Sequence, residues 1–136
     1  MTIDDFKRSH ARIEHALIAG EALLSNPSGL SAHLKGVRSE VLQHFKAKDL
    51  FYPALAEQCT KAGDSAGAHL TQIFESNMRV QSAAVQRFFE TLDGTQQATL
   101  VSSFQTVASV IRQRFGTEEK AVFPLFVRSA KTLGHP

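Results

Sequence analysis

The sequence lacks several features that mark secreted and membrane-spanning proteins. It contains a single cysteine, Cys59, so no internal disulfide framework can form, and a lone thiol fits a reducing compartment. No apolar run approaches the ~18 residues that a membrane-spanning helix needs. The opening residues, MTIDDFKRSH, are acidic and polar where a signal peptide would be basic and then apolar. We therefore expect a cytoplasmic protein that does not associate with a membrane, with Cys59 inert.

The sequence also lacks a block of one charge. Its 15 Lys and Arg residues and 13 Asp and Glu residues give a formal charge of +2 that is spread along the chain, so we expect no direct contact with nucleic acid. Tryptophan is absent, and most of the 10 phenylalanines recur at helical spacing, which is typical of a core. The 136 residues fit one domain, 1–136, that is long enough to bury such a core.

Residues that interrupt helices gather at only three places: SNPSG at 25–29, KAGDSAG at 61–67 and LDGT at 92–95. These breaks leave four long segments, none of which contains an alternating β-branched run. Long amphipathic helices joined by short loops pack as antiparallel neighbours. The sequence therefore predicts an all-α protein, an up-down-up-down antiparallel four-helix bundle.

The starts of three segments carry capping residues. Thr2 and Asp5 have the spacing of a capping box, and the helix that they begin is expected to run to about Leu24. Asp64 and Thr95 are expected to cap the N-termini of the third and fourth helices.

Apolar residues recur every three or four positions in the first, second and fourth segments, and the same stepping passes through polar residues. In the first segment it includes His10, and in the second it includes His44 and Lys48. In the fourth segment it includes Arg114 and Glu118. We therefore expect these side chains to face the interior of the bundle.

The third segment is less regular. His69 heads an apolar stripe that continues through Ile73, Val80, Ala84 and Phe88. With a rise of about 1.5 Å per residue, the polar positions of all four segments fall at one level near one end of the bundle. We expect His69 to join the other inward polar residues there.

Several buried polar groups are costly unless they satisfy one another or bind a ligand, so a shared polar site is expected. Imidazoles and carboxylates on facing helices are also how a bundle core holds a di-iron or similar metal centre. The candidate donors are His10, His44, His69 and Glu118, with Asp49 and Glu119 in reserve.

Lys48 and Arg114 argue against a two-metal centre, because cations cannot bind a metal while they are protonated. One interpretation is a buried network in which these two cations pair with Glu118 and Asp49, an arrangement that would set helix register more than stability. The other is a single Zn or Fe ion held by the three histidines and one carboxylate. The pattern alone leaves both open.

Two segments resemble the paired His-x-x-x-Glu repeats, each followed by an aromatic residue and proline, of hemerythrin-like HHE cation-binding proteins. They are HFKAKDLFYPAL (44–55) and RFGTEEKAVFPLF (114–126), and SHARIEHAL (9–17) and AHLTQIF (68–74) extend the similarity over most of the chain. The resemblance implies a helical bundle with a di-iron centre that binds oxygen or senses oxygen, nitric oxide or iron. It also implies ligand positions at His10, His44, His69 and Glu118.

The chain departs from that family pattern at three ligand positions. Lys48 stands where the resemblance implies a glutamate, Arg114 where it implies a histidine, and Ser65 where a histidine would precede His69 by four residues. The first repeat is also one residue shorter between its histidine and Pro53 than the second is between Arg114 and its proline. A full di-iron centre is therefore not expected.

The ending RFGTEEKAVFPLFVRSAKTLGHP, with VLQHF in the second segment, is also similar to the regulator of sigma D family of anti-sigma factors. That resemblance implies a metal-free bundle whose partner is a sigma factor. No nucleophile elbow, phosphate loop or paired acid and base accompanies either resemblance, so we expect no enzymatic activity. The leading hypotheses are a metal or small-ligand sensor with a reduced site and a protein-interaction module of the anti-sigma type. A di-iron oxygen-binding protein ranks third.

Overall fold

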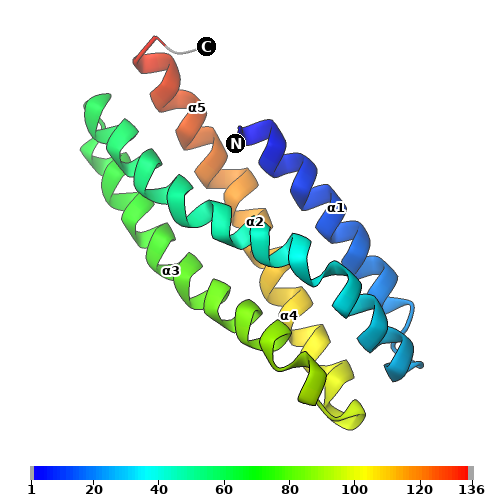
Figure 1. Cartoon of the computed structure of the whole chain (residues 1–136). Coiled ribbons are helices and arrows are strands. Elements are labelled where there is room, and N and C mark those ends of the chain that lie inside the picture. The colour runs from blue at the N-terminus through cyan, green and yellow to red at the C-terminus, as the bar shows by residue number, and fades with distance from the viewer. Residues whose placement is uncertain (1, 135–136) are drawn as a thin grey trace.

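The computed structural model describes residues 2–134 as a set of long helices (Figure 1). Its elements are α1 (Ile3–Glu21), α2 (Pro27–Lys61), α3 (Ser65–Glu90), the short 3₁₀ helix η1 (Leu92–Gly94), α4 (Gln97–Thr117), the π-helical segment η2 (Glu118–Val122) and α5 (Phe123–Thr132). The last three follow one another without a loop and form the fourth rod of the bundle, and neighbouring rods run in opposite directions. The predicted all-α, up-down-up-down four-helix bundle is confirmed.

Capping explains where most of the helices begin. The capping box of Thr2 and Asp5 is formed in both directions, and the Asp64 carboxylate accepts the backbone N–H of Gly67 at 2.8 Å. The prediction for Thr95 is wrong, because its hydroxyl donates instead to the carbonyl of Thr91 at 2.7 Å. Thr95 is the C-cap of η1, and α4 begins one residue later than a Thr95 cap would place it.

The helices differ in length, and this difference determines which residues of neighbouring helices lie at the same height along the bundle axis. α1 has 19 residues and α2 has 35. The ring of Phe6, three residues after the start of α1, lies 5.1 Å from that of Phe51, ten residues before the end of α2, so about two turns of α2 extend beyond the start of α1 (Figure 1). α3 begins at that extended end. α1 and α3 therefore do not start at the same level, and the predicted common level of the polar positions in all four segments is wrong for α3.

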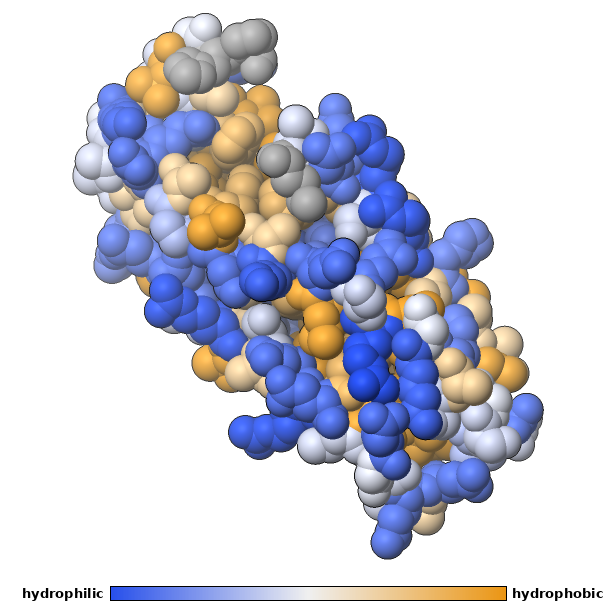
Figure 2. Space-filling model, in the orientation of Figure 1, coloured by the Kyte–Doolittle hydropathy of each residue, from blue (hydrophilic) through white to orange (hydrophobic). Residues whose placement is uncertain are grey.

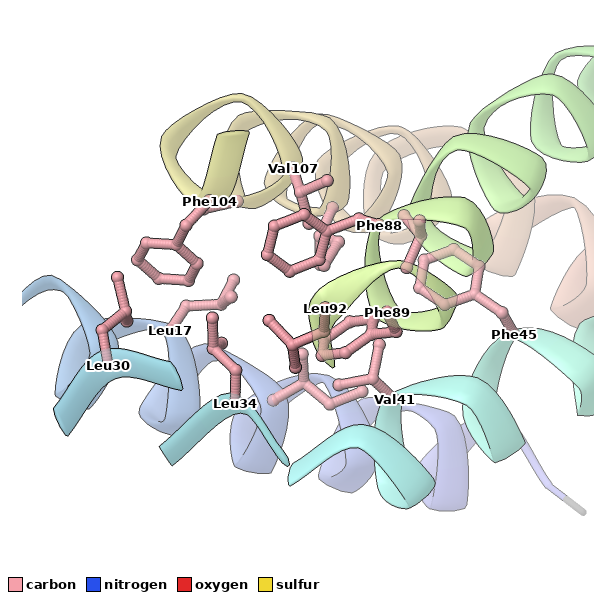
Figure 3. Packing of buried hydrophobic residues seen from close by; sticks show 14 of the residues in the cluster. Leu17, Leu30, Leu34, Val41, Phe45, Phe88, Phe89, Leu92, Phe104 and Val107 are labelled. Carbon is pink, nitrogen blue, oxygen red and sulfur yellow. The ribbon is translucent and has the colours of Figure 1, made fainter. Parts of the chain in front are cut away.

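Two apolar clusters fill the bundle. The cluster shown in Figure 3 includes Leu17, Leu34, Phe89 and Phe104. The second cluster, nearer the turn between α2 and α3, includes Phe6, Tyr52, Leu55, Cys59, Met78 and Phe123. Cys59 is fully buried in it. Five of the polar residues predicted to face inward lie where the two clusters meet: His10, His44, Lys48, Arg114 and Glu118.

None of the helices within residues 2–134 combines the length and the apolar character that crossing a bilayer requires.

Candidate functional site

Five polar side chains from three of the rods are buried together between the apolar clusters. Lys48 and Glu118 are 0% exposed, Arg114 is 2% exposed, and the two histidines, His10 and His44, are 3% exposed. The regular heptad-like stepping of α1, α2 and α4 places them there, since each continues an apolar stripe. Their predicted inward orientation is confirmed.

Glu118 is the centre of this cluster. Its Oε1 accepts from the Lys48 ammonium, and its Oε2 accepts from the Tyr52 hydroxyl at 2.5 Å. The Nε of Arg114 lies 3.7 Å from Oε2, which is too long for a hydrogen bond, and the Nε2 of His10 lies 3.3 Å from Oε1. One carboxylate therefore faces two cations, an imidazole and a phenol.

His10 connects Glu118 and Lys48 with the surface. Its Nε2 lies 3.1 Å from the Lys48 Nζ, and because an ammonium can only donate, Nε2 must accept. The ring proton is then on Nδ1, which lies 3.2 Å from Oε1 of Glu119. The imidazole is held flat on the ring of Phe115, with the ring centroids 3.7 Å apart. Glu119, with 48% of its side chain exposed, also lines a groove of about 380 Å³ between α1 and α4.

Burial and the ion pair act in opposite directions on the two central charges. Burial lowers the pKa of Lys48 to about 8, although the Glu118 carboxylate partly offsets this effect. Burial alone would raise the pKa of Glu118, but the Lys48 charge and the hydrogen bonds from Lys48 and Tyr52 lower it to about 2. Both groups are therefore predominantly charged at neutral pH.

Arg114 is less well satisfied than Lys48. Its Nη1 donates to Oε1 of Gln81 on α3 at 3.2 Å, and its Cζ lies 5.9 Å from the ring centroid of Tyr52. Its Nε and Nη2 have no hydrogen-bond partner among residues 2–134. A buried guanidinium with two unpaired N–H groups is unusual, because buried polar groups normally find partners.

His44 also lacks polar partners: within the described part of the chain, neither of its ring nitrogens forms a hydrogen bond. Its ring packs edge-on against aromatic rings, with centroid distances of 4.9 Å to His10 and 5.2 Å to Phe115. Burial, followed by the charge of Lys48, lowers the pKa of His44 to about 2. The imidazole is therefore neutral in the folded protein.

The inward placement of His69 was wrong. His69 is exposed, near the start of α3, beside a groove at the turn between α2 and α3. The predicted stripe through Ile73, Val80 and Ala84 is exposed as well. The buried stripe of α3 instead follows Gly67, Thr71, Met78, Val85, Phe88 and Phe89.

The α3 residue at the level of the cluster is Gln81, through its bond to Arg114. His69 lies twelve residues earlier, or about 18 Å along the helix axis. The two reserve donors, Asp49 and Glu119, also differ from the prediction. Asp49 is exposed on α2 and, in the described part of the chain, contacts neither buried cation, whereas the Glu119 carboxylate contacts His10.

Tyr52 and Gln81 belong to the cluster although the sequence pattern did not single them out. Tyr52 lies four residues after Lys48, one further step along the same helix face. That spacing could have identified it as a donor to the cluster. Gln81 could have been found only with the correct stripe of α3, which passes through Met78 and Val85.

The π-helical segment η2 explains the unequal lengths of the two repeats. Pro124 follows Arg114 by ten residues, whereas Pro53 follows His44 by nine. η2 absorbs the additional residue, since the N–H of Phe123 bonds to the carbonyl of Glu118, five residues earlier. Such segments are frequent at functional sites, and this one begins at the residue that organises the cluster.

The residues present do not fit a two-metal centre. Within residues 2–134, no three His, Cys, Asp or Glu side chains are grouped so that they could hold a metal ion. Glu118 already accepts from Lys48 and Tyr52, and the Lys48 ammonium contacts both His10 and Glu118, the two donors that would have to share an ion.

Comparison with known proteins identifies the family. Curated proteins and solved structures give no significant match to the chain. A family model described as the hemerythrin HHE cation binding domain matches residues 1–126, which is nearly the whole chain. The match agrees with the helical bundle and with the two proline-containing repeats. The chain therefore belongs to the hemerythrin HHE cation-binding domain family.

Proposed function

We propose that the protein is a non-enzymatic binding or regulatory module in which the central cation is its own Lys48 ammonium. The observation that carries this proposal is the position of the Lys48 Nζ, which contacts both Nε2 of His10 and Oε1 of Glu118. It thereby uses donor atoms that a metal ion would require. The cluster then acts as a fixed polar centre that sets the register of α1, α2 and α4.

Electrostatics support a cation in this position that is not a metal. Two unit charges ~4 Å apart interact by on the order of 4 kcal/mol at an effective dielectric constant of about 20, and a divalent ion would double that repulsion from each neighbouring cation. Lys48 and Arg114 both lie within reach of Glu118, so an ion beside this carboxylate would meet two such charges. The pair would have to move apart before metal could bind.

Metal analysis tests this proposal directly. Protein purified without chelator, after growth with added iron or zinc, is expected to hold less than about a tenth of an equivalent of metal, because the donors are already engaged. The matched positive control is the double variant Lys48→Glu with Arg114→His, which removes both cations and adds two donors. We expect this variant to gain metal. Stoichiometric metal in the unmodified protein would contradict the proposal.

A protein partner is the expected target of such a module. Figure 2 shows apolar surface between α5 and the end of α2, beyond the start of α1, and Leu50 on α2 is 80% exposed. A sigma factor is one candidate partner, on the resemblance of α4, η2 and α5 to anti-sigma factors. Purified sigma factor should co-elute with the full chain in size-exclusion chromatography, and Leu50→Asp should weaken that complex without unfolding the bundle. Separate elution at micromolar concentrations would exclude a stable complex with that partner.

A single-metal or small-ligand sensor is the second candidate, favoured by His44. Its two ring nitrogens have no partner among the described residues, and its ring lies 4.9 Å from that of His10. A single Zn or Fe ion held by these imidazoles and Glu118 would require Lys48 to leave its present position. Stoichiometric binding of one ion by the unmodified protein would favour this candidate. A di-iron oxygen-binding protein is third, and absence of oxo-iron absorption after aerobic iron loading would exclude it.

A further inference from the structure

The buried cluster contains more positive than negative charge. Lys48 and Arg114 are at most 2% exposed, whereas Glu118 is the one carboxylate that reaches both of them among residues 2–134. Glu119 is half exposed and lies on the far side of the His10 imidazole. The centre of the bundle therefore encloses a net positive charge, which is costly to bury without a counter-ion.

The excess charge is concentrated on Arg114. Glu118 gives its two oxygens to Lys48 and Tyr52, so its charge is already compensated by two donors. Among residues 2–134, the neutral Gln81 is the only hydrogen-bond partner of the guanidinium, through Nη1, and Oε2 of Glu118 lies 3.7 Å from Nε, beyond hydrogen-bond range. Arginine stays protonated in proteins, so deprotonation cannot relieve the imbalance.

The unpaired donors of Arg114 also have a defined geometry. Nε–H and one N–H of Nη2 lie parallel on the same edge of a planar guanidinium, and these are the two nitrogens without a partner in the described chain. An edge of this kind binds one anion through two hydrogen bonds. The two N–H groups on this edge point in one fixed direction, so they define a specific binding position, which a patch of exposed positive charge does not.

We propose that this edge of Arg114 binds a small monovalent inorganic anion of the size of chloride. The ligand must be small, because Arg114 is 2% exposed and its neighbours Tyr52 and Glu118 are 0% exposed, so a large ion could not reach this edge from solvent. It must be monovalent, because a single net positive charge has to be balanced. The chain would then bind an anion at the centre of the bundle, although its family is described as cation-binding.

Thermal unfolding in two sodium salts tests the proposal. Chloride and gluconate are compared at equal ionic strength, since gluconate is too large for an enclosed site. Above its dissociation constant, chloride should raise the melting temperature by ~3–5 °C for each tenfold increase in concentration, because it binds only the folded state. Gluconate should not. Equal melting temperatures in the two salts at all concentrations would overturn the proposal.

Two arginine variants localise the effect. Arg114→Gln should abolish the difference between chloride and gluconate, because it removes the charged edge. The matched control is Arg112→Gln, which removes an arginine of the same helix that pairs at the surface with Glu14 and Glu21. This control should retain the chloride dependence. A chloride dependence that persists in Arg114→Gln would show that the ion binds elsewhere and would overturn the assignment.

Direct binding keeps the proposal testable if Arg114→Gln does not fold. Chloride NMR linewidths of the unmodified protein should broaden with protein concentration, and bromide should compete for the site. Absence of broadening by the folded protein would again overturn the proposal. These experiments need no partner protein, so a failure to find a partner and a failure to bind chloride are distinguishable.

Discussion

The two proline-containing repeats of this bundle face each other but fill their inner positions with opposite chemistry. In α2, the inner positions four residues apart are His44 and Lys48, and in the fourth rod they are Arg114 and Glu118. Each repeat contains one inner cation, Lys48 in α2 and Arg114 in the fourth rod. The inner carboxylate, Glu118, comes from the fourth rod and lies within 4 Å of both cations. The ion pair between Lys48 and Glu118 joins the two repeats, so the polar centre forms only when α2 and the fourth rod pack together.

The comparison also separates stability from specificity. A buried ion pair contributes little net stability compared with well-packed apolar residues, but removal of one partner leaves an uncompensated buried charge. We therefore expect Lys48 and Glu118 to fix the register of α2 against the fourth rod more than they raise the free energy of unfolding. A slip of either rod by one residue would separate the Lys48 ammonium from the Glu118 carboxylate that it now contacts.

The largest effect is expected from Lys48→Met, which breaks the pair between the repeats on one side only. It should lower the free energy of unfolding by ~3–5 kcal/mol, because it leaves the Glu118 carboxylate buried without its cation. Urea denaturation measures the change. The matched control is Lys61→Met, which breaks the exposed pair with Glu57 and should cost less than about 1 kcal/mol.

A double-mutant cycle sharpens this prediction. Lys48→Met combined with Glu118→Gln removes both charges and should recover part of the loss, giving a coupling of at least about 1 kcal/mol. Additive losses would mean that the two side chains do not act as a pair. Similar costs for Lys48→Met and Lys61→Met would mean that the buried pair behaves like an exposed one.

The next largest effect is a loss of stability at low pH caused by His44, the second inner residue of α2. The pKa of His44 falls from 6.5 to about 2 on folding, so the unfolded chain binds the additional proton between these values. Stability from this group is therefore complete above pH 6.5 and is lost as the pH falls. The loss approaches ~1.4 kcal/mol per pH unit, or about 2–3 kcal/mol by pH 4.5.

Urea denaturation from pH 7.5 to 4.5 tests this expectation. His44→Phe keeps an aromatic ring at the site and should flatten the dependence of stability on pH in this range. Glu118 adds its own loss only below about pH 4.5, because its pKa is lowered from 4.5 to about 2, so the two effects separate. An unchanged slope in His44→Phe would show that another group causes the acid sensitivity.

How well the sequence predicted this centre differs between helices. His10, His44, Lys48, Arg114 and Glu118 were predicted correctly as inward residues, because long apolar stripes in α1, α2 and α4 admit only one face. The start of α3 reads GAHLTQIF, in which small and apolar residues fit two faces equally well. A stripe through His69 and a stripe through Thr71 were both consistent with that stretch, and packing against the longer α2 decided between them.

Two further features were beyond single-sequence reasoning for physical reasons. The level of His69 depends on α1 being shorter than α2, which is a property of how the rods align and not of any one stripe. The partners of Arg114 depend on rotamers that bring Gln81 close and leave Oε2 of Glu118 3.7 Å from Nε. The pattern predicted that Arg114 and Glu118 would lie together, but not that the guanidinium would remain partly unpaired.

The smallest effect is expected from Tyr52→Phe, which changes one hydrogen bond and leaves both cations in place. Loss of the hydroxyl removes the 2.5 Å bond to Oε2 of Glu118 and should cost ~1–2 kcal/mol, because Arg114 can move toward the freed oxygen. That movement would pair its Nε and should therefore weaken the chloride dependence of the melting temperature. Urea denaturation and the comparison of chloride with gluconate measure the two consequences on the same variant. A variant as stable as the unmodified protein with full chloride dependence would show that Tyr52 does not control how Glu118 is shared between the repeats.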